Sequence, residues 1–465
     1  MANINESIFR EYDIRGRESE EELNTSSLEL IGRAYGTYLT RRGIETVIVG
    51  NDSRATSEDF REAAIEGLLS TGRKVINIGT VMTPMMSWAQ FHFNTEGGIM
   101  ITASHNPKGW NGAKLADGFA STLGGEELKE LYKMIKNDDF DTVVGGELKK
   151  EDIKKEYIED LISRVDVKKE FRVVVSTGNG TAGLFAPDLF NALGCKVIER
   201  HTEPDANFPN YTPNPADTEM MEDTGGIVLE NEADFGLAFD GDGDRLGLTD
   251  EEGNVVWPDK FAIFLARLVL KNKPGAKIIY DVKSSRALAE DIEAHGGEPI
   301  MAPTGHSNIK RVMKEKGAEL GAELSGHIFV KDNYYGFDDA SMAAVSLIQY
   351  FSEQDKAVSR LVAETPQYVS SPGYTAATPD DKKFQVVKEM TEEFKNEGYK
   401  VVDIDGARVN FKELEGWGLV RVSNTGPNIT LRFEAKTKDN LKKIEDIFRE
   451  KLSRYDFVSK EWVAG

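Results

Sequence analysis

The order of strand and helix signals repeats three times before residue 368. Each copy has an apolar run typical of a buried strand, a helical stretch, a glycine, a second apolar run, and a later strand that ends in a polar loop. In the order just given, the first copy consists of 47–49, 58–69, Gly72 and 75–78 and leads to Ser104. The second consists of 173–175, 182–193, Gly194 and 197–198 and leads to Asp240. The third consists of 278–280, 287–295, Gly296 and 299–301 and leads to Glu323. Alternating strands and helices predict α/β layers, whose ligands bind beyond the carboxyl ends of the strands. We therefore expect three similar domains whose polar loops meet in one cleft.

The chain after Tyr368 has a different pattern, with a helix over 382–395 and strands over 419–422 and 429–433. This pattern predicts a smaller α+β domain. A chain of 465 residues is expected to hold three or four domains of about 100 to 200 residues each. The predicted fold class is α/β: three similar mixed-sheet α/β domains plus a smaller C-terminal α+β domain around one central cleft. Polar, Gly or Pro-containing stretches divide the chain into residues 1–150, 151–254, 255–367 and 368–465.

Charge and composition exclude several classes of protein. The net charge of −22 and the isoelectric point near 4.9 disfavour binding to nucleic acid or to anionic membranes. The single cysteine, Cys195, rules out an intramolecular disulfide, and the first ten residues lack the pattern of a secretory signal. The longest apolar helical stretch, 261–270, is shorter than the roughly 20 residues of a membrane span. We expect a cytoplasmic protein with a locally basic cleft for any phosphorylated substrate.

Residues 102–107 (TASHNP) follow the apolar run 99–101, so the predicted strand presents Ser104 in a loop. Such a serine is open to two interpretations. Ser, Asn and Pro are common in loops for backbone reasons alone, which makes Ser104 a simple turn residue. A serine hydroxyl in this position is also suited to carry a transferred group.

Residues 240–245 (DGDGDR) follow the apolar run 235–239 and place Asp240, Asp242 and Asp244 at alternate positions. That spacing can bring three oxygens onto one hard cation, and Mg²⁺ fits such ligands. A solvated acidic turn is the alternative, although three crowded carboxylates repel one another and favour a bound cation. The serine loop and the magnesium-type loop together favour phosphoryl transfer. A phosphatase with Asp240 as the nucleophile ranks second, because it leaves Ser104 without a task.

Both loops resemble those of the α-D-phosphohexomutase family, T-A/G-S-H-N-P and D-G-D-G-D-R, without a substitution. Two more stretches resemble that family: 323–327 (ELSGH), and 421–427 (RVSNTGP) followed by 431–434 (LRFE). The resemblance thus extends over nearly the whole chain. The last loop is similar to the phosphomannomutase/phosphoglucomutase branch, whereas the phosphoglucosamine branch typically has S-G-T-E-P there.

The resemblance implies a role for each matching residue. Ser104 is expected to be phosphorylated and to donate its phosphate. His105 and Asn106 are expected to shape its loop and contact the phosphate, and Arg245 to contact the phosphate. The first three predicted domains then supply the phosphoserine loop, the metal site and the sugar contacts, and the fourth binds phosphate. Proton handling and charge stabilisation fall to Arg15, Lys114 and His327.

The remaining matches imply substrate contacts. Glu323, Ser325 and His327 alternate along what we expect to be a short extended segment, so that their side chains face one side. Ala322 replaces the glycine usual in the family. Substrate-binding residues are further expected at Lys283, His306, Arg421, Ser423, Asn424 and Thr425, with Arg432 either supporting the last loop or structural.

The implied enzyme interconverts the 1-phosphate and 6-phosphate of mannose, glucose or both, through a phosphoserine and a hexose 1,6-bisphosphate that also activates it. Its expected partners are Mg²⁺ and a small phosphosugar. Phosphoglucosamine mutase activity is an alternative. A non-catalytic sugar-phosphate sensor would need neither Ser104 nor the three aspartates. The sequence leaves the preferred hexose, the pathway and the oligomeric state open.

Overall fold

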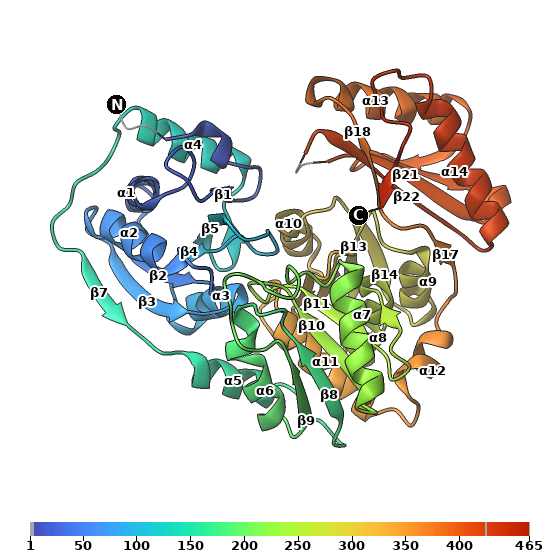
Figure 1. Ribbon diagram of the computed structural model, residues 1–465, viewed down its shortest axis with the longest axis horizontal. Helices are drawn as coiled ribbons and strands as arrows, with labels where there is room; N and C mark the ends of the chain where they lie inside the picture. The colour runs from blue at the N-terminus through green and yellow to red at the C-terminus, as the bar shows by residue number, and fades with distance from the viewer. Residues whose placement is uncertain (1–3, 424–425, 465) are drawn as a thin grey trace. The chain divides into compact units, whose positions relative to one another are not determined.

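The computed structural model describes residues 4–423 and 426–464 and consists of mixed and antiparallel sheets covered by helices (Figure 1). The chain divides into two compact units. One contains the chain up to Phe261 together with Ser325–Arg360, and the other contains Ala262–Leu324 and the chain from Leu361 onward. The predicted third domain, 255–367, therefore contributes to both units. The domain boundaries, the single central cleft and the cytoplasmic location stay predictions.

The first sheet is mixed and lies between two helical layers. Its order is β1 (Ile14–Arg17), β5 (Trp110–Gly118), β4 (Gly97–Ile101), β2 (Thr46–Asn51), β3 (Lys74–Thr80) and β7 (Glu147–Lys150), with β6 (Ser121–Thr122) beside β5. One face packs against α1 (Thr25–Thr40), α2 (Ser57–Leu69) and α4 (Gly125–Lys136), and α3 (Thr83–His92) contacts β2 and β4. Strand β2 is apolar at consecutive positions because Val47 to Val49 are buried on both faces.

The second sheet has the same central arrangement. Its order is β12 (Val255–Val256), β11 (Leu246–Thr249), β10 (Phe235–Phe239), β8 (Arg172–Ser176) and β9 (Lys196–Arg200). Its helices are α5 (Lys154–Ser163), α6 (Ala186–Ala192) and α7 (Thr218–Glu230). The helix predicted over 182–193 is confirmed for Ala186–Ala192, and its first part is wrong. A 3₁₀ turn, Thr181–Leu184, precedes α6, since Pro187 has no backbone N–H to continue a helix and instead occupies the first turn of α6.

The third copy contains β13 (Lys277–Asp281) between β14 (Glu298–Ala302) and β15 (Leu320–Ala322), all parallel. Its helices include α8 (Pro258–Asn272), α9 (Arg286–Ala294) and α10 (His306–Lys316). In all three copies the first strand of the repeat lies between the second and the third, parallel to both. The predicted repeat of α/β domains is confirmed. Across the residues that the structure describes, no helix has the length and apolar character needed to span a membrane.

The C-terminal part has an antiparallel sheet in the order β19 (Lys400–Val402), β20 (Ala407–Phe411), β21 (Gly416–Val422), β22 (Asn428–Ala435), β18 (Tyr374–Ala377) and β23 (Val463–Ala464). Strand β17 (Val369–Ser370) also pairs with β22. Helices α13 (Asp380–Asn396) and α14 (Lys438–Leu452) share one apolar core with this sheet. The smaller α+β domain is confirmed. The remaining elements are β16 (Ile328–Val330), α11 (Ala340–Ser352), α12 (Val358–Ala363) and the 3₁₀ turns Glu6–Ile8 and Lys412–Leu414.

A buried carboxylate, Asp339, joins α5 to α11. It caps α11 by accepting hydrogen bonds from the backbone N–H groups of Ser341 (2.9 Å) and Met342 (3.0 Å). The hydroxyls of Tyr157 (3.0 Å) and Tyr334 (2.7 Å) also donate to it. Burial raises the pKa of Asp339 to about 6, although these hydrogen bonds favour the carboxylate.

We predict that Asp339→Asn changes the pH dependence of stability. Because the folded pKa of Asp339 lies above the ordinary value of 3.8, its contribution to stability is complete below that value and is lost as pH rises through 6. The wild type should therefore lose up to about 3 kcal/mol relative to the variant between pH 4 and 7. Urea unfolding of both proteins across this range measures the difference. A difference that does not vary with pH would contradict the prediction.

Candidate active site

Ser104 lies in the loop that follows β4 and faces the loop that follows β10. Its backbone has φ +49°, a left-handed conformation uncommon for a residue with a Cβ. The Ser104 N–H donates to Thr102 Oγ1 at 2.8 Å, and its hydroxyl donates to Asp240 Oδ2 at 3.1 Å. The side chain is almost fully buried. The structure thus brings together the two loops that the sequence singles out.

Glycines in the acidic loop allow its close approach to the serine loop. A Cβ at Gly241 would lie 2.5 Å from the Ser104 carbonyl oxygen, which leaves no space for a side chain. Gly243 has φ +74°, a conformation that glycine adopts without strain. As a result Asp240, Asp242 and Asp244 are buried, each with a carboxylate oxygen within 4.8 Å of the others. This arrangement is that of a candidate metal site.

Lys114 on β5 balances part of this negative charge. Its Nζ lies 2.8 Å from Asp242 Oδ2 and 2.6 Å from Asp244 Oδ2. Burial alone would lower the pKa of Lys114, but the two carboxylates outweigh it and raise the pKa. Asp242 Oδ2 also accepts hydrogen bonds from the hydroxyls of Thr83 and Thr102. Thr102 is the first residue of the TASHNP loop, whereas no sequence motif marks Thr83.

The aspartates differ in their affinity for protons. Burial, followed by the charges of Asp244 and Asp242, raises the pKa of Asp240 well above its usual range. Burial acts in the same direction on Asp244, but Lys114 and His327 outweigh it and hold the Asp244 pKa well below the usual range. The cationic side chains nearby therefore do not balance three ionised carboxylates. A bound cation would supply the missing positive charge and allow Asp240 to ionise.

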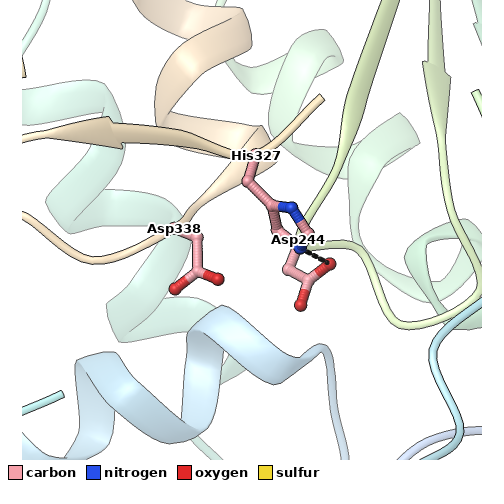
Figure 2. Close-up of side chains that lie close together, drawn as sticks. All are labelled: Asp244, His327 and Asp338. Carbon is pink, nitrogen blue, oxygen red and sulfur yellow. Dashed lines mark ion pairs between the residues drawn. The ribbon is translucent and has the colours of Figure 1, made fainter. Parts of the chain in front are cut away.

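His327 is held against the acidic loop by a β-bridge between Arg245 and His327. Its Nε2 lies 3.3 Å from Asp244 Oδ1, and its Nδ1 lies 2.9 Å from the hydroxyl of Ser325. Figure 2 shows Asp338 beside this pair, and the three side chains form a second group with ligand atoms within 4.8 Å of one another. No sequence motif marks Asp338. It enters the group because it pairs with Phe329 in an isolated β-bridge.

Two arginines and a histidine lie close to the serine loop. Arg15 Nη1 donates to Asn106 Oδ1 at 2.8 Å, and Arg15 also pairs with Asp13. Arg245 Nε lies 3.8 Å from Asp240 Oδ2. His105 Nδ1 is 3.2 Å from the Ser104 hydroxyl, and burial together with Arg245 and Arg15 lowers the pKa of His105 well below its usual value. Positive charge and a neutral imidazole therefore lie next to Ser104.

The predicted sugar contacts divide between the two units. In the second unit, the backbone N–H of Gly305 donates to Glu323 Oε1 at 2.6 Å, and His306 is the next residue, the first of α10. Lys283 Nζ lies 3.7 Å from Asp281 Oδ2. The predicted extended segment from Glu323 to His327 is wrong: it forms a turn in which Gly326 has φ +99°, so the side chains do not alternate as in a strand. Ser325 and His327 belong to the first unit.

The candidate phosphate loop follows β21 in the second unit. Arg421 Nε donates to Asp405 Oδ2 at 3.0 Å, and Lys383 Nζ donates to the carbonyl oxygens of Ser423 (2.8 Å) and Gly426 (3.0 Å). Asn424 and Thr425 lie outside the described residues. Arg432 lies on β22, paired in register with Leu419 of β21. Asp405 and Lys383 are further residues of this loop's surroundings that the motifs do not reveal, because they lie elsewhere in the sequence.

Comparison with known proteins covers every part of this architecture. Models of the phosphoglucomutase/phosphomannomutase alpha/beta/alpha domains I, II and III match residues 6–142, 155–253 and 257–368, and that of the C-terminal domain matches residues 375–451. A phosphomannomutase/phosphoglucomutase of Pseudomonas putida is 40% identical over 98% of this chain and 97% of its own length. A phosphoglucomutase of Neisseria gonorrhoeae is 38% identical over 97% of both chains.

A solved structure has the same arrangement of elements. The crystal structure of a phosphoglucomutase/phosphomannomutase family protein from Burkholderia thailandensis superposes with a TM-score of 0.90 at 36% identity, covering 97% of this chain and 98% of that one. The resemblance inferred from the four motifs is confirmed. With all four domain models matched and relatives 38% and 40% identical over nearly its whole length, the chain belongs to the phosphoglucomutase/phosphomannomutase family of α-D-phosphohexomutases.

Proposed function

We propose that this protein interconverts the 1-phosphates and 6-phosphates of mannose and glucose, with Ser104 as the phosphoryl carrier. The observation that carries the proposal is the buried Ser104 hydroxyl, 3.1 Å from Asp240 in the three-aspartate cluster and close to Lys114 and two arginines. A hydroxyl among carboxylates and cations suits phosphoryl transfer, in which catalysis depends mainly on positioning and electrostatic stabilisation. The names of the relatives support mannose and glucose phosphates as substrates.

The proposed reaction transfers one phosphoryl group in each direction. The free hydroxyl oxygen of the sugar phosphate attacks the phosphorus on Ser104, a new P–O bond forms, and the bond from phosphorus to Ser104 Oγ breaks. The hydroxyl proton passes to a nearby base, for which His327 is the candidate, and the departing Ser104 Oγ takes up a proton, for which the cationic Lys114 is the candidate donor. The resulting hexose 1,6-bisphosphate reorients and returns its other phosphoryl group to Ser104. Added bisphosphate would phosphorylate an enzyme that has lost this group, and so act as an activator.

The aspartate cluster fits Mg²⁺. Three carboxylates supply the hard oxygen ligands that this cation prefers. Asp242 Oδ1 is buried and accepts no hydrogen bond from any described residue, which leaves that oxygen available to a cation. Bound there, Mg²⁺ would offset negative charge on the transferred phosphoryl group. Lys114 and Arg245 then supply further positive charge from the chain itself.

A second subsite would hold the phosphate that does not react. Arg421, Ser423, Asn424 and Thr425 offer a guanidinium, hydroxyls and amides for this purpose. Arg432 on β22 would support their loop. Lys283, His306, Glu323 and Ser325 would contact the sugar and its phosphate. In this proposal the residues around Ser104 transfer the phosphoryl group, and the Arg421 loop keeps the bisphosphate intermediate bound.

Ser104→Ala should abolish mutase turnover. A coupled assay with mannose, glucose and glucosamine 1-phosphates, Mg²⁺ and glucose 1,6-bisphosphate measures the activity. Mass spectrometry of the wild type should place a phosphate on Ser104, and chelation of Mg²⁺ should stop turnover until the metal is restored. Ser70→Ala, which removes a hydroxyl at the end of α2, is the control. A phosphate mapped to Asp240 would favour the phosphatase, and a preference for glucosamine phosphate would reassign the substrate.

Lys114→Met should make the stability of the protein depend more strongly on Mg²⁺, because it removes a positive charge that balances the aspartates. Breaking a buried ion pair destabilises a protein by about 3 to 5 kcal/mol, so the variant should unfold at a lower temperature in EDTA. Mg²⁺ should raise the unfolding temperature of the variant more than that of the wild type. Lys451→Met, which removes another buried lysine paired with Glu393 and Glu397, should show no such response. Equal responses to Mg²⁺ would argue against the metal site.

Arg421→Ala should weaken the grip on the phosphate that does not react. Loss of a charge-assisted hydrogen bond costs on the order of 1.5 to 3 kcal/mol, or roughly tenfold or more in affinity. We expect a higher Michaelis constant and more free hexose 1,6-bisphosphate released per turnover, while Ser104 is still phosphorylated. Arg311→Ala, an exposed residue of α10, serves as the control. Unchanged affinity and unchanged release would exclude Arg421 from the phosphate subsite.

A further inference from the structure

Arg54 is a buried cation directly behind the loop of Ser104. It lies between β2 and α2, and only 6% of its surface is exposed. Neither the TASHNP motif nor the acidic loop includes it. The ring of Phe208, itself buried, lies over its guanidinium with the centroid 5.2 Å from Cζ. A charge so far removed from water requires partners that match it.

Every N–H of this guanidinium donates a hydrogen bond. Nη2 donates to the carbonyl oxygens of Ser104 and Asn106, both at 2.6 Å. Nη1 donates to the carbonyl oxygens of Pro107 and Trp110, both at 3.2 Å. Nε donates to Asp52 Oδ2 at 3.2 Å, which completes the five donors that an arginine possesses. Four of the five bonds therefore end on the backbone that carries Ser104 into β5.

The Ser104 loop depends on such support because its backbone is strained. Ser104 has φ +49°, and a residue with a Cβ persists in this region only where its surroundings impose the conformation. The carbonyl oxygens of Ser104 and Asn106 point at the same nitrogen of Arg54. Without a cation there, these two oxygens would repel each other and the loop would relax toward a more common conformation.

Arg54 is itself fixed from the other side. Asp52 accepts a hydrogen bond from the Arg54 backbone N–H (3.1 Å) and another from the Ser57 hydroxyl. The Asp52 N–H donates to the Ile101 carbonyl at 2.9 Å, so Asp52 is tied to the end of the strand that precedes Ser104. Asn111 Nδ2 donates to Ser57 Oγ at 3.0 Å. The guanidinium is therefore held in place before any ligand binds.

The internal repeat gives this position a counterpart in each copy. The last residues of the first strands that pair with the third strand of their copy are Asn51, Ser176 and Tyr280. Three residues further along lie Arg54, Asn179 and Lys283. Asn179 also acts on backbone, donating to the Glu203 carbonyl at 2.7 Å. In the first copy the position is thus a cation directed at the loop of its own domain.

We propose that Arg54 is a positioning residue that holds the Ser104 loop in its reactive conformation through four backbone carbonyl groups. The proposal rests on the assignment of Ser104 as phosphoryl carrier. Arg54 acts through the backbone alone, so its loss should lower the rate of transfer to and from Ser104 more than it weakens substrate binding. The effect should depend on the forked shape of the guanidinium as well as on its charge.

Arg54→Lys tests this, because an ammonium has three donors and cannot reach five acceptors. We expect kcat to fall at least about tenfold with KM within about threefold, since small displacements of reacting groups cost rate more than affinity. Phosphorylation of Ser104 by glucose 1,6-bisphosphate, followed by mass spectrometry, should slow by a similar factor. Arg73→Lys is the matched control: Arg73 is a buried arginine of the same domain that donates to the Ile44 carbonyl. Unfolding temperatures of both variants show whether the effect is merely structural.

Chemical rescue separates shape from charge. In Arg54→Ala, methylguanidinium should restore part of the phosphorylation rate and methylammonium should not. If Arg54→Lys does not fold, Asp52→Asn tests the proposal instead, because Asp52 accepts the hydrogen bond of Arg54 Nε. This variant should slow Ser104 phosphorylation several-fold. Wild-type rates in Arg54→Lys or Asp52→Asn, or equal rescue by both cations, would overturn the proposal. A wild-type protein that is never phosphorylated on Ser104 would instead refute the proposed function itself.

Discussion

Three buried carboxylates on one short loop are the constraint on which the first unit depends. Asp240, Asp242 and Asp244 cannot all be ionised in a dry interior without positive charge nearby. Lys114 contacts Asp242 and Asp244, and His327 also lies against Asp244, whereas Asp240 resists ionisation. The protein therefore maintains a site with a local excess of negative charge. Such a site is costly for stability and suited to a cation and to phosphoryl chemistry, which explains why stability and activity should respond together to Mg²⁺.

The repeated α/β arrangement makes this concentration of charge possible. Parallel strands end at one edge of a sheet, so loops that follow β4 and β10 present polar groups without disturbing the apolar strands behind them. Small residues then set the distance between loops, as Gly241 does against the Ser104 carbonyl. The Asp339 network secures α5 against α11 in the same unit. The apolar layers thus provide most of the stability, and the loops at the strand ends carry the polar side chains of the candidate site.

Buried cations hold both candidate phosphate loops from behind. Arg54 donates to carbonyl groups of the Ser104 loop, and Lys383, also buried and paired with Asp380, donates to those of Ser423 and Gly426. A backbone whose carbonyl oxygens are bound on one side can turn its N–H groups and side chains to the other. This is a useful property for a loop that must bind an anion, since anions are bound by N–H and cationic donors.

The sequence by itself determined the repeat, the α+β ending, the loops of Ser104 and Asp240 and the family, because apolar periodicity and short motifs are local properties. The sequence does not predict the helix break before α6 or the turn at Gly326, since both depend on backbone geometry that periodicity does not report. Tertiary structure alone revealed Arg54, Asp338, Lys383 and Asp405. Each acts on residues distant in sequence through contacts that no spacing rule describes. Short motifs in the sequence identify the residues proposed to react. The residues that hold them in place are identified only by the tertiary structure, because they lie on separate elements that come together on packing.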